Sequence, residues 1–393
     1  MRVLQIISSV AVGLGGVLES VRMLSEDWTK SGHQVEVATL DPPGFADALA
    51  FPVRVHTLGP SRTKYAYSSA FYPWLREHHH EYDIVLVHGL WQYHTFASWR
   101  ALHGQATPYT AFTHGMLDPY FKRRFPLKHL KKWLFWPWSE YRLLRDAKAV
   151  MFTCEEEKVL ARQSFFLYKA HELVVGLGTK QSPFPLPAAR EAFLNRFPQL
   201  REKRLLIFMG RLHPKKACDL LLEAFSSTLA ADPSWQLVMA GPDLDGWGPT
   251  LQQLASQLQI QDRVTWTGML QGELKWGALA ASEVFALPSH QENFGIVVAE
   301  ALACGLPVLL SDQVNIWREV ESSQAGFVTT DTRSGVEKAL TLWSRLSETE
   351  RLEMRSRCLP CFQRYFDIHT VSASLMQTLE GIVDASRTMP QSV

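Results

Sequence analysis

The sequence predicts an α/β protein that consists of two Rossmann-like domains. Short apolar runs alternate with helical patterns through the first half of the chain and again through the second, as expected for βαβ units around parallel sheets. The chain has 393 residues, enough for two such domains, of which 46% are hydrophobic and 20% charged. Such domains bind ligands at the carboxyl ends of their strands, so we expect the two to face one another across a binding cleft.

The first domain starts with an apolar run at residues 3–7, which we expect to be a buried strand. Gln5, Ser8 and Ser9 interrupt the apolar residues here, so a strand explains the segment better than a secretion signal. A helix is expected at residues 17–31. Further strands are expected at residues 34–40, 84–87, 109–112, 149–152 and 173–175.

The second domain repeats this alternation. Its strands are expected at residues 204–210, 236–240, 264–267, 284–287 and 308–310. Between the two series, residues 178–203 contain four prolines, which is a linker composition. A last helical pattern, at about residues 361–385, has no strand after it.

Composition argues against several classes of protein. The formal net charge of +1 gives no overall field that would attract nucleic acid. Five cysteines, an odd number, do not suggest a disulfide framework, so we expect a reducing cytoplasm. Cys358 and Cys361 form a lone CxxC pair without further ligands nearby. No apolar stretch reaches the roughly 18 residues that cross a bilayer.

Residues 289–309, SHQENFGIVVAEALACGLPVL, hold two carboxylates. Glu292 lies in the loop after an expected strand, and Glu300 lies slightly over two turns further on, on the helix face that points back toward that loop. The backbone N–H groups at the helix start, at Asn293, Phe294 and Gly295, form an anion site. This set suits a sugar nucleotide, because one glutamate can bind sugar hydroxyls, the amides phosphate, and the other glutamate ribose.

A second motif, GRLHPKKACDLLLEAF at residues 210–225, joins an expected strand to a helix. Its loop contains Arg211 and Lys216. Two fixed cations in this position stabilise the negative charge that grows on a departing pyrophosphate. Lys215 stands directly beside Lys216.

These two motifs resemble those of retaining glycosyltransferases of the GT-B fold, in particular family 4 (group 1). The resemblance implies that Arg211 and Lys216 bind the diphosphate, although Ala217 stands where the family usually has glycine. It implies that Glu292 contacts the transferred sugar and Glu300 the ribose. The reaction implied is a front-face displacement without a covalent enzyme intermediate.

The resemblance also implies a division of the chain. Residues 1–180 would form an N-terminal acceptor domain and residues 203–365 a C-terminal domain that binds the nucleotide-sugar donor. The last helix, about residues 366–393, would pack back on the N-terminal domain.

Four residues of the first half are further candidates. Gly15 and Gly16 follow the first strand, where a glycine loop of the family approaches the donor. His114, in THGMLDP at the end of a strand, corresponds to a family histidine that contacts the donor sugar near its anomeric centre. Trp91 ends the preceding strand in the same way and offers an apolar face to an acceptor sugar. The alternatives are a tight turn for the glycines and a loop-fixing hydrogen bond for His114.

Three patterns look like metal or acid clusters, but we expect other roles for them. Asp243 and Asp245 spell a DxD triad, yet they follow a strand and turn, and Asp245 is expected to cap the next element. The three histidines at residues 78–80 are expected on a solvated helix end, and the three glutamates at residues 155–157 in a first helical turn. We therefore expect no metal site.

Residues 120–138, YFKRRFPLKHLKKWLFWPW, interleave cations with aromatic side chains. This pattern suits the interface of an anionic membrane. A helix that packs its aromatics on its own domain and shows its lysines to water is an equally good interpretation.

The expected function is transfer of a hexosyl unit from a UDP- or GDP-linked sugar to a glycan or lipid-linked acceptor, in polysaccharide or glycoconjugate biosynthesis. No cofactor and no metal are expected. The protein is expected to be cytoplasmic, with peripheral binding at the inner face of the membrane as an option. One alternative is a nucleotide-sugar epimerase on the same fold, for which no acid and base around the sugar's C2 can be assigned. The other is a non-catalytic sugar-binding protein.

Overall fold

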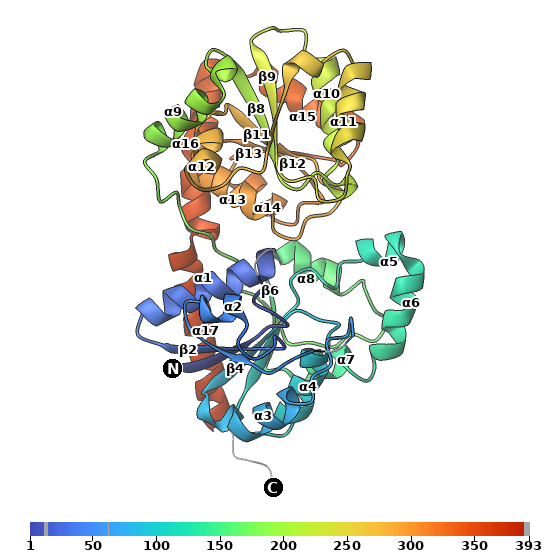
Figure 1. The fold of residues 1–393 in the computed structure, drawn as a ribbon, viewed down its shortest axis with the longest axis vertical. Helices are drawn as coiled ribbons and strands as arrows, with labels where there is room; N and C mark the ends of the chain where they lie inside the picture. Colours follow the sequence, from blue (N-terminus) through green and yellow to red (C-terminus); the bar gives the residue numbers. More distant parts are fainter. Residues whose placement is uncertain (12–14, 62, 389–393) are drawn as a thin grey trace. The chain divides into compact units, whose positions relative to one another are not determined.

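The computed structural model of the protein describes residues 1–11, 15–61 and 63–388. The chain forms two compact units (Figure 1). Unit 1 consists of Met1–Gly178 and Ile368–Val393, and unit 2 consists of Thr179–Asp367.

Unit 1 contains a seven-stranded parallel sheet with the order β3-β2-β1-β4-β5-β6-β7. All residues of β4, β5 and β6 are buried, because helices cover both faces of the sheet (Figure 1). The expected strands lie within two residues of their expected ends; β3, a partly exposed strand at the sheet edge, was not predicted. The strands are β1 (Arg2–Ile6), β2 (Gln34–Thr39), β3 (Arg54–Thr57), β4 (Ile84–His88), β5 (Tyr109–Phe112), β6 (Ala149–Phe152) and β7 (Glu172–Val174).

The helices of unit 1 include one from the end of the chain. In α17, Leu375 and Leu379 pack with Trp28 of α1 in one buried cluster. Trp28 Nε1 donates a hydrogen bond to the carbonyl oxygen of Ser372, 3.1 Å away. The helices are α1 (Gly16–Lys30), α2 (Ala46–Leu49), α3 (Phe71–His78), α4 (Tyr93–Leu102), α5 (Tyr120–Arg124), α6 (Pro126–Phe135), α7 (Glu140–Asp146), α8 (Glu155–Ala161) and α17 (Ile368–Thr388), with the 3-10 helix η1 (His79–Glu81).

Unit 2 contains a six-stranded parallel sheet with the order β10-β9-β8-β11-β12-β13. Its strands β9, β11 and β12 are fully buried and mostly apolar. The strands are β8 (Arg204–Met209), β9 (Trp235–Ala240), β10 (Val264–Gly268), β11 (Val284–Leu287), β12 (Val308–Ser311) and β13 (Gly326–Thr329). The helices are α9 (Leu186–Arg196), α10 (Cys218–Thr228), α11 (Gly248–Gln257), α12 (Gly272–Ala281), α13 (Ile296–Ala303), α14 (Trp317–Ser322), α15 (Arg333–Arg345) and α16 (Glu348–Tyr365), with η2 (Pro198–Leu200), η3 (Pro214–Lys216) and η4 (Gln261–Arg263).

The segment at residues 178–203 is not a linker, contrary to its composition. It contains α9, whose Ala189 and Phe193 are completely buried. A Cβ added at Gly277 of α12 would lie 2.0 Å from the carbonyl oxygen of Ala189, so this glycine permits close packing of the two helices. Pro185, Pro187 and Pro198 lie at the starts of α9 and η2, where proline is tolerated.

The last helical pattern is also interrupted. Helix α16 ends at Tyr365 and α17 begins at Ile368. Between them the carbonyl oxygen of Phe366 accepts a hydrogen bond of 2.7 Å from the backbone N–H of Thr179. The chain thus passes between the units at two adjacent points, residues 178–179 and 367–368.

Each sheet has one point at which the strand order reverses. This point lies between β1 and β4 in unit 1 and between β8 and β11 in unit 2. In doubly wound sheets, ligands bind outside the carboxyl ends of the strands at this point. The loops concerned carry Gly15 and Trp91 in unit 1, and Arg211, Lys216 and Glu292 in unit 2.

Candidate functional site

Two loops of unit 2 are joined where the strand order reverses. His290 lies in the loop after β11, and Lys215 lies in the loop after β8. The backbone N–H of His290 donates a hydrogen bond of 2.9 Å to the carbonyl oxygen of Lys215. Lys215 Nζ donates to Gln291 Oε1 at 2.8 Å, and Lys216 Nζ contacts Glu292 Oε2. The structure therefore brings together the two motifs that lie about 80 residues apart in the sequence.

The two predicted diphosphate ligands differ in their exposure to water. The side chain of Arg211 is 46% exposed and lies 3.9 Å from Asp245, whereas that of Lys216 is 16% exposed. Burial, with the nearby charges of Lys215 and Arg211, lowers the pKa of Lys216 to about 7. The contact with the Glu292 carboxylate acts in the opposite direction, by favouring the ammonium form.

Ala217 has a left-handed backbone conformation, with φ of 51° and ψ of 41°. Glycine adopts this conformation without the steric cost that a Cβ brings. This explains why glycine is usual here and why the alanine is a strained substitute. The turn allows α10 to begin directly after Lys216.

The loop that carries Glu292 is held by its own backbone. Glu292 donates its N–H to the carbonyl oxygen of Gln313, and Asn315 donates its N–H to the carbonyl oxygen of Glu292, both at 2.9 Å. Gly295, with φ of 73°, turns the chain into α13 immediately after Asn293 and Phe294. Phe294 is 4% exposed and packs edge-on against Phe366.

Glu300 lies on the second turn of α13 and is 7% exposed. Its Oε1 accepts a hydrogen bond of 2.6 Å from Lys275 Nζ of α12. Lys275 was not predicted from the sequence, because nothing in the α12 segment signals a partner on α13. A lysine here compensates the buried carboxylate and orients it.

Asp243, not Asp245, caps the helix that follows the DxD triad. The two carboxylate oxygens of Asp243 accept hydrogen bonds from the backbone N–H groups of Trp247 and Gly248, at 2.8 and 3.0 Å. These are free donors at the start of α11. The expectation that Asp245 is the cap was wrong, since Asp245 faces Arg211 instead.

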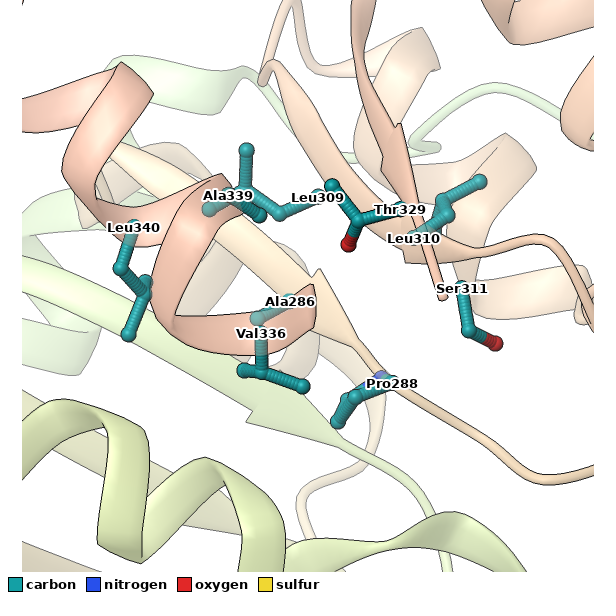
Figure 2. Close-up of a pocket in the computed structure, with 9 residues that line it drawn as sticks. All are labelled: Ala286, Pro288, Leu309, Leu310, Ser311, Thr329, Val336, Ala339 and Leu340. Atoms are coloured by element: carbon teal, nitrogen blue, oxygen red, sulfur yellow. The ribbon is translucent and has the colours of Figure 1, made fainter. Parts of the chain in front are cut away.

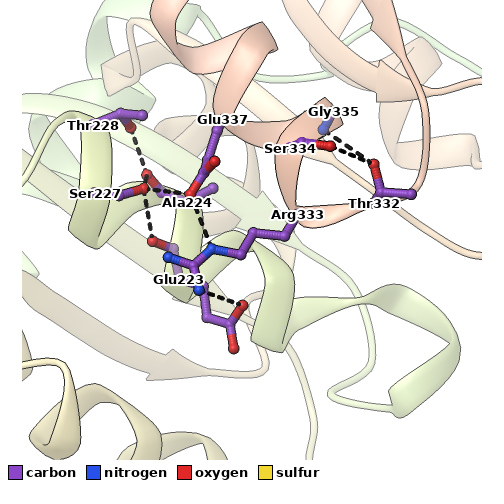
Figure 3. Close-up of polar contacts among 9 residues, drawn as sticks. All are labelled: Glu223, Ala224, Ser227, Thr228, Thr332, Arg333, Ser334, Gly335 and Glu337. Carbon is purple, nitrogen blue, oxygen red and sulfur yellow. Dashed lines mark hydrogen bonds and ion pairs between the residues drawn. The ribbon is translucent and has the colours of Figure 1, made fainter.

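A polar network fixes α10, the helix that follows Lys216, against α15 (Figure 3). Arg333 Nε lies 3.0 Å from Glu337 Oε1, and Arg333 Nη1 lies 3.7 Å from Glu223 Oε2 of α10. Ser227 Oγ of α10 donates to Glu337 Oε1 at 2.8 Å. These partly exposed groups therefore link the two helices.

In unit 1 the predicted glycine loop is described in part. Residues 13–14 lie outside the described residues, whereas Gly15, with φ of 88°, precedes Gly16, the first residue of α1. Apart from its chain neighbours, no atom of the described residues lies within 4 Å of a Cβ built on Gly15. Earlier in the loop, Asp41 accepts hydrogen bonds from Ser9 Oγ and from the backbone N–H of Val10, at 2.5 and 2.8 Å.

His114 lies in a loop that a buried carboxylate holds. Glu157 of α8 accepts hydrogen bonds of 2.6 Å from Thr113 Oγ1 and from the backbone N–H of Gly115. It accepts two more from the backbone and the hydroxyl of Thr153, at 2.8 and 2.6 Å. The expectation for Glu157 was only a carboxylate in a first helical turn, which it also is.

The imidazole of His114 is partly buried and has a histidine as its neighbour. His114 Nε2 lies 3.0 Å from His88 Nδ1, and the backbone of His114 is left-handed, with φ of 48°. Burial lowers the pKa of His114 to about 4 and that of His88 well below its ordinary value. Both rings are therefore neutral at pH 7, so each can donate one hydrogen bond and accept one.

The ring of Trp91 is partly covered by its neighbours. The Nζ atom of Lys132 lies 4.2 Å from the centre of its ring, and Trp136 and Phe165 pack nearby. Trp91 Nε1 donates to the carbonyl oxygen of Met116 at 3.3 Å, and its backbone N–H donates to Glu140.

The three histidines at residues 78–80 are not all solvated, which corrects the expectation. His79 is 8% exposed and its Nδ1 lies 3.0 Å from Thr107 Oγ1. His78 stacks on Trp74. In the described part of the chain, no group of three or more His, Cys, Asp or Glu side chains is placed to hold a metal ion.

A cavity beneath α15 in unit 2 is not a candidate site (Figure 2). It measures about 10 Å³, and its lining is apolar apart from Ser311 and Thr329. This is about the space of one water-sized sphere, and it lacks the polar partners that hold a water. It is a packing gap between the helix and the sheet.

Two family descriptions match the chain, each over one unit. Residues 15–178 match "Glycosyl transferase 4-like domain", and residues 190–357 match "Glycosyl transferases group 1". Among solved structures, Anabaena HepE in complex with UDP and glucose has a TM-score of 0.75 at 19% identity, over 97% of this chain and 100% of that one. Sucrose-phosphate synthase from Thermosynechococcus elongatus has a TM-score of 0.78 at 18% identity, over 98% and 99%.

The two Rossmann-like sheets and the motif loops at their points of reversal define a protein of the GT-B fold. The chain belongs to the group 1 glycosyltransferases, family 4.

Curated relatives match part of the chain. D-inositol 3-phosphate glycosyltransferase of Rhodococcus opacus is 32% identical over 188 residues, 47% of this chain and 40% of that protein. The enzyme of that name from Thermomonospora curvata is 32% identical over 221 residues, 52% and 50% respectively. The matched region thus spans half or less of the length of these relatives.

Proposed function

We propose that the protein transfers a hexosyl unit, with retention of configuration, from a nucleotide-diphosphate sugar to a glycan or lipid-linked acceptor. The observation that carries this proposal is the joining of the Lys216 loop to the Glu292 loop where the sheet of unit 2 reverses. Membership of a glycosyltransferase family supports it. HepE, a protein of the same fold, was solved with UDP-glucose, so a UDP-sugar is the first donor to test.

In this proposal unit 2 holds the donor. Arg211 and Lys216 bind the diphosphate and stabilise the charge that grows on it as the glycosidic bond breaks. Glu292 binds hydroxyls of the sugar, and Glu300 binds those of the ribose. The acceptor hydroxyl forms the new bond on the face that the nucleoside diphosphate leaves, and its proton passes to the departing phosphate.

In unit 1 we assign His114 to the sugar near its anomeric carbon, and Gly15 and Gly16 to the approach of the phosphate. A neutral imidazole suits this task, since it forms hydrogen bonds without a positive charge beside the oxocarbenium-like centre.

The test is a panel of UDP- and GDP-hexoses assayed for release of the nucleotide, with mass spectrometry of the products. We expect release with at least one donor, and a product that is heavier than its acceptor by one hexose unit. Because cations and amides meet the diphosphate charge, activity should persist in EDTA. Activity that EDTA abolishes and Mn²⁺ restores would contradict metal independence. A C2-inverted nucleotide sugar as product would instead indicate an epimerase.

We also propose that α5 and α6 dock on an anionic membrane surface. None of their residues is buried, and Leu127, Leu130 and Leu134 of α6 are 78, 63 and 70% exposed at positions that share one helix face. The two helices also carry exposed cations near these leucines in the sequence: Lys122, Arg123, Arg124, Lys128 and Lys131. Each cation near such a surface contributes about 1 kcal/mol. No helix in the described residues is long and apolar enough to span a membrane.

Co-sedimentation with liposomes tests this docking. Binding should require anionic lipid, weaken with salt and decrease in a Lys128→Glu, Lys131→Glu variant. A Lys203→Glu, Lys338→Glu variant carries the same change of charge on exposed residues of unit 2 and should bind normally. Protein that stays in the supernatant with anionic liposomes at low salt would contradict the proposal.

A further inference from the structure

Three side chains from separate segments of unit 1 meet beside the carboxyl end of β4. Trp91 follows β4, Lys132 lies on α6 and Glu140 is the first residue of α7. Lys132 Nζ lies over the ring of Trp91, and the backbone N–H of Trp91 donates to Glu140 Oε1 at 3.1 Å. Of the three, only Trp91 was predicted from the sequence to be a site residue.

Glu140 has unused hydrogen-bonding capacity. The residue is 1% exposed, and its Oε1 also accepts from Thr95 Oγ1 at 3.2 Å. Its Oε2 has no hydrogen-bond partner of normal geometry among the described residues. Burial raises the pKa of Glu140, although its own backbone N–H and the Ser139 hydroxyl also act on the carboxylate and lower it. A buried carboxylate oxygen with incomplete hydrogen bonding is costly, and in a native protein such an atom calls for an explanation.

Lys132 complements this carboxylate. In the described part of the chain its ammonium contacts the rings of Trp91 and Phe121 and makes no ion pair or hydrogen bond. Burial lowers the pKa of Lys132 to about 8, while the nearby charge of Glu140 acts to raise it. The group is therefore still an ammonium at pH 7, with donors available to a ligand.

The backbone of Trp91 is itself unusual. Its φ is 76°, a left-handed conformation that is rare for a residue with a large side chain. Such strain persists where the surrounding structure imposes it, and it is concentrated at functional sites. Here the hydrogen bond from Trp91 to Glu140 holds the strained residue in place.

We infer that Trp91, Lys132 and Glu140 form a subsite for a hydroxyl group of the acceptor sugar. The hydroxyl donates to Glu140 Oε2 and accepts from Lys132 Nζ, with the carbon face of the sugar beside the Trp91 ring. A carboxylate paired with an ammonium suits a neutral group that both donates and accepts. It disfavours a phosphate, which the Glu140 charge would repel. This inference rests on the proposed function and adds the acceptor contacts to it.

Neighbouring lysines on α6 provide a matched test. Lys132 lies over the ring of Trp91, whereas Lys131 is exposed to water. Lys132→Met therefore removes a positive charge at the subsite, and Lys131→Met removes the same charge at the surface. Glu140→Gln is the third variant. Saturation-transfer NMR would measure binding of the methyl α-hexosides of glucose, galactose and mannose, and calorimetry would measure binding of UDP and GDP.

We expect the wild-type protein and Lys131→Met to bind at least one hexoside. Lys132→Met and Glu140→Gln should bind it about tenfold more weakly or worse, as expected for loss of a charged hydrogen bond. Nucleotide affinity should be equal in all four proteins. Lys131→Met should weaken binding to anionic vesicles, and Lys132→Met should not.

Unchanged hexoside affinity in Lys132→Met would overturn the subsite, as would a wild-type protein that binds none of the three hexosides. Thermal unfolding of each variant separates loss of the subsite from loss of the fold, and Lys132→Met is expected to fold because α6 has no buried residue. Failure to bind any nucleotide would contradict the proposed function instead, so the two failures are distinguishable.

Discussion

Arg211, in the loop after β8, is the cation that we assign to the diphosphate of the donor. Its side chain is nearly half exposed, and its ion pair with Asp245 is long, at 3.9 Å. We expect Arg211→Ala to lower turnover by about 10²-fold or more, because a charge contact to the transition state is lost. Steady-state kinetics with the donor found by the panel measures this.

Arg357→Ala is the matched control, since Arg357 is 41% exposed and has a similarly long ion pair of 3.7 Å with Glu353 on α16. It should leave turnover unchanged. An Arg211→Ala enzyme with near wild-type turnover would contradict the assignment of Arg211 to the leaving group.

Glu292 and Glu300 should give different defects when replaced. Glu292→Ala should mainly depress turnover, because the assigned contact is with the transferred sugar. Glu300→Ala should mainly weaken binding of the free nucleoside diphosphate, by the loss of a ribose contact. Lys275→Met should share the defect of Glu300→Ala, because Lys275 orients that carboxylate. Calorimetry with UDP and GDP measures nucleotide affinity in each variant. Equal losses of nucleotide affinity in the Glu292 and Glu300 variants would contradict the assignment of different roles to the two glutamates.

The contacts found only in the structure share one property. Lys275, Glu157 and Glu140 act on residues of other elements, and no local pattern marks such a contact in the sequence. Motif residues such as Arg211 and Glu292 could be predicted because their neighbours in the sequence form the loop in which they lie. Their assigned roles stay predictions.

At the scale of elements, buried carboxylates hold the loops after two neighbouring strands. Glu140 accepts a hydrogen bond from the backbone N–H of Trp91, in the loop after β4. Glu157 accepts one from the backbone N–H of Gly115, in the loop after β5. Both loops contain a non-glycine residue with positive φ, Trp91 or His114. The carboxylates therefore impose backbone conformations that the local sequence does not favour.

We expect Glu157→Ala to lower the free energy of unfolding by about 3 kcal/mol, since two backbone N–H groups and two hydroxyls lose their acceptor. Glu155→Ala, in the same helical turn but exposed, should cost about 0.5 kcal/mol. Denaturant titration compares the two, and hydrogen exchange should rise at residues 113–116 in the first variant alone. Equal losses of stability would show that Glu157 does not hold the loop.

Among the elements, buried strands were the most predictable. Strands β4, β5 and β11 are fully buried and mostly apolar, and their expected ranges agree within one residue. The partly exposed strands β3 and β13 lack such a run and were missed. Helix α9 was taken for a linker because prolines at its start resemble a proline-rich loop, while its packing on α12 cannot be read from local composition.

At the scale of the whole molecule, three histidines whose pKa is strongly lowered by burial lie in one unit. His88, His94 and His114 all belong to unit 1, and burial lowers the pKa of each, to about 4 for His94 and His114. Below their ordinary pKa of about 6.5 the unfolded chain binds protons that the folded chain does not. Stability is therefore fully present above about pH 6.5 and decreases as the pH falls toward 4.

We expect unit 1 to lose about 1 kcal/mol of stability for His94 alone between pH 7 and 5.5. Hydrogen exchange measured by mass spectrometry reports each unit separately, and unit 1 should open first on acidification. A His94→Asn variant that still folds should depend less on pH over this range. Parallel loss of protection in both units would contradict this account.

The position of α17 at the end of the chain has a consequence for biosynthesis. A ribosome delivers residues 1–178 first, then roughly 190 residues of unit 2, and only then the helix that covers Trp28. At 5–20 residues per second, this interval is about 10–40 s. During this interval, the apolar surface beside α1 is not yet covered by α17. We therefore expect this surface of unit 1 to be accessible to water or to other proteins until synthesis of unit 2 is complete.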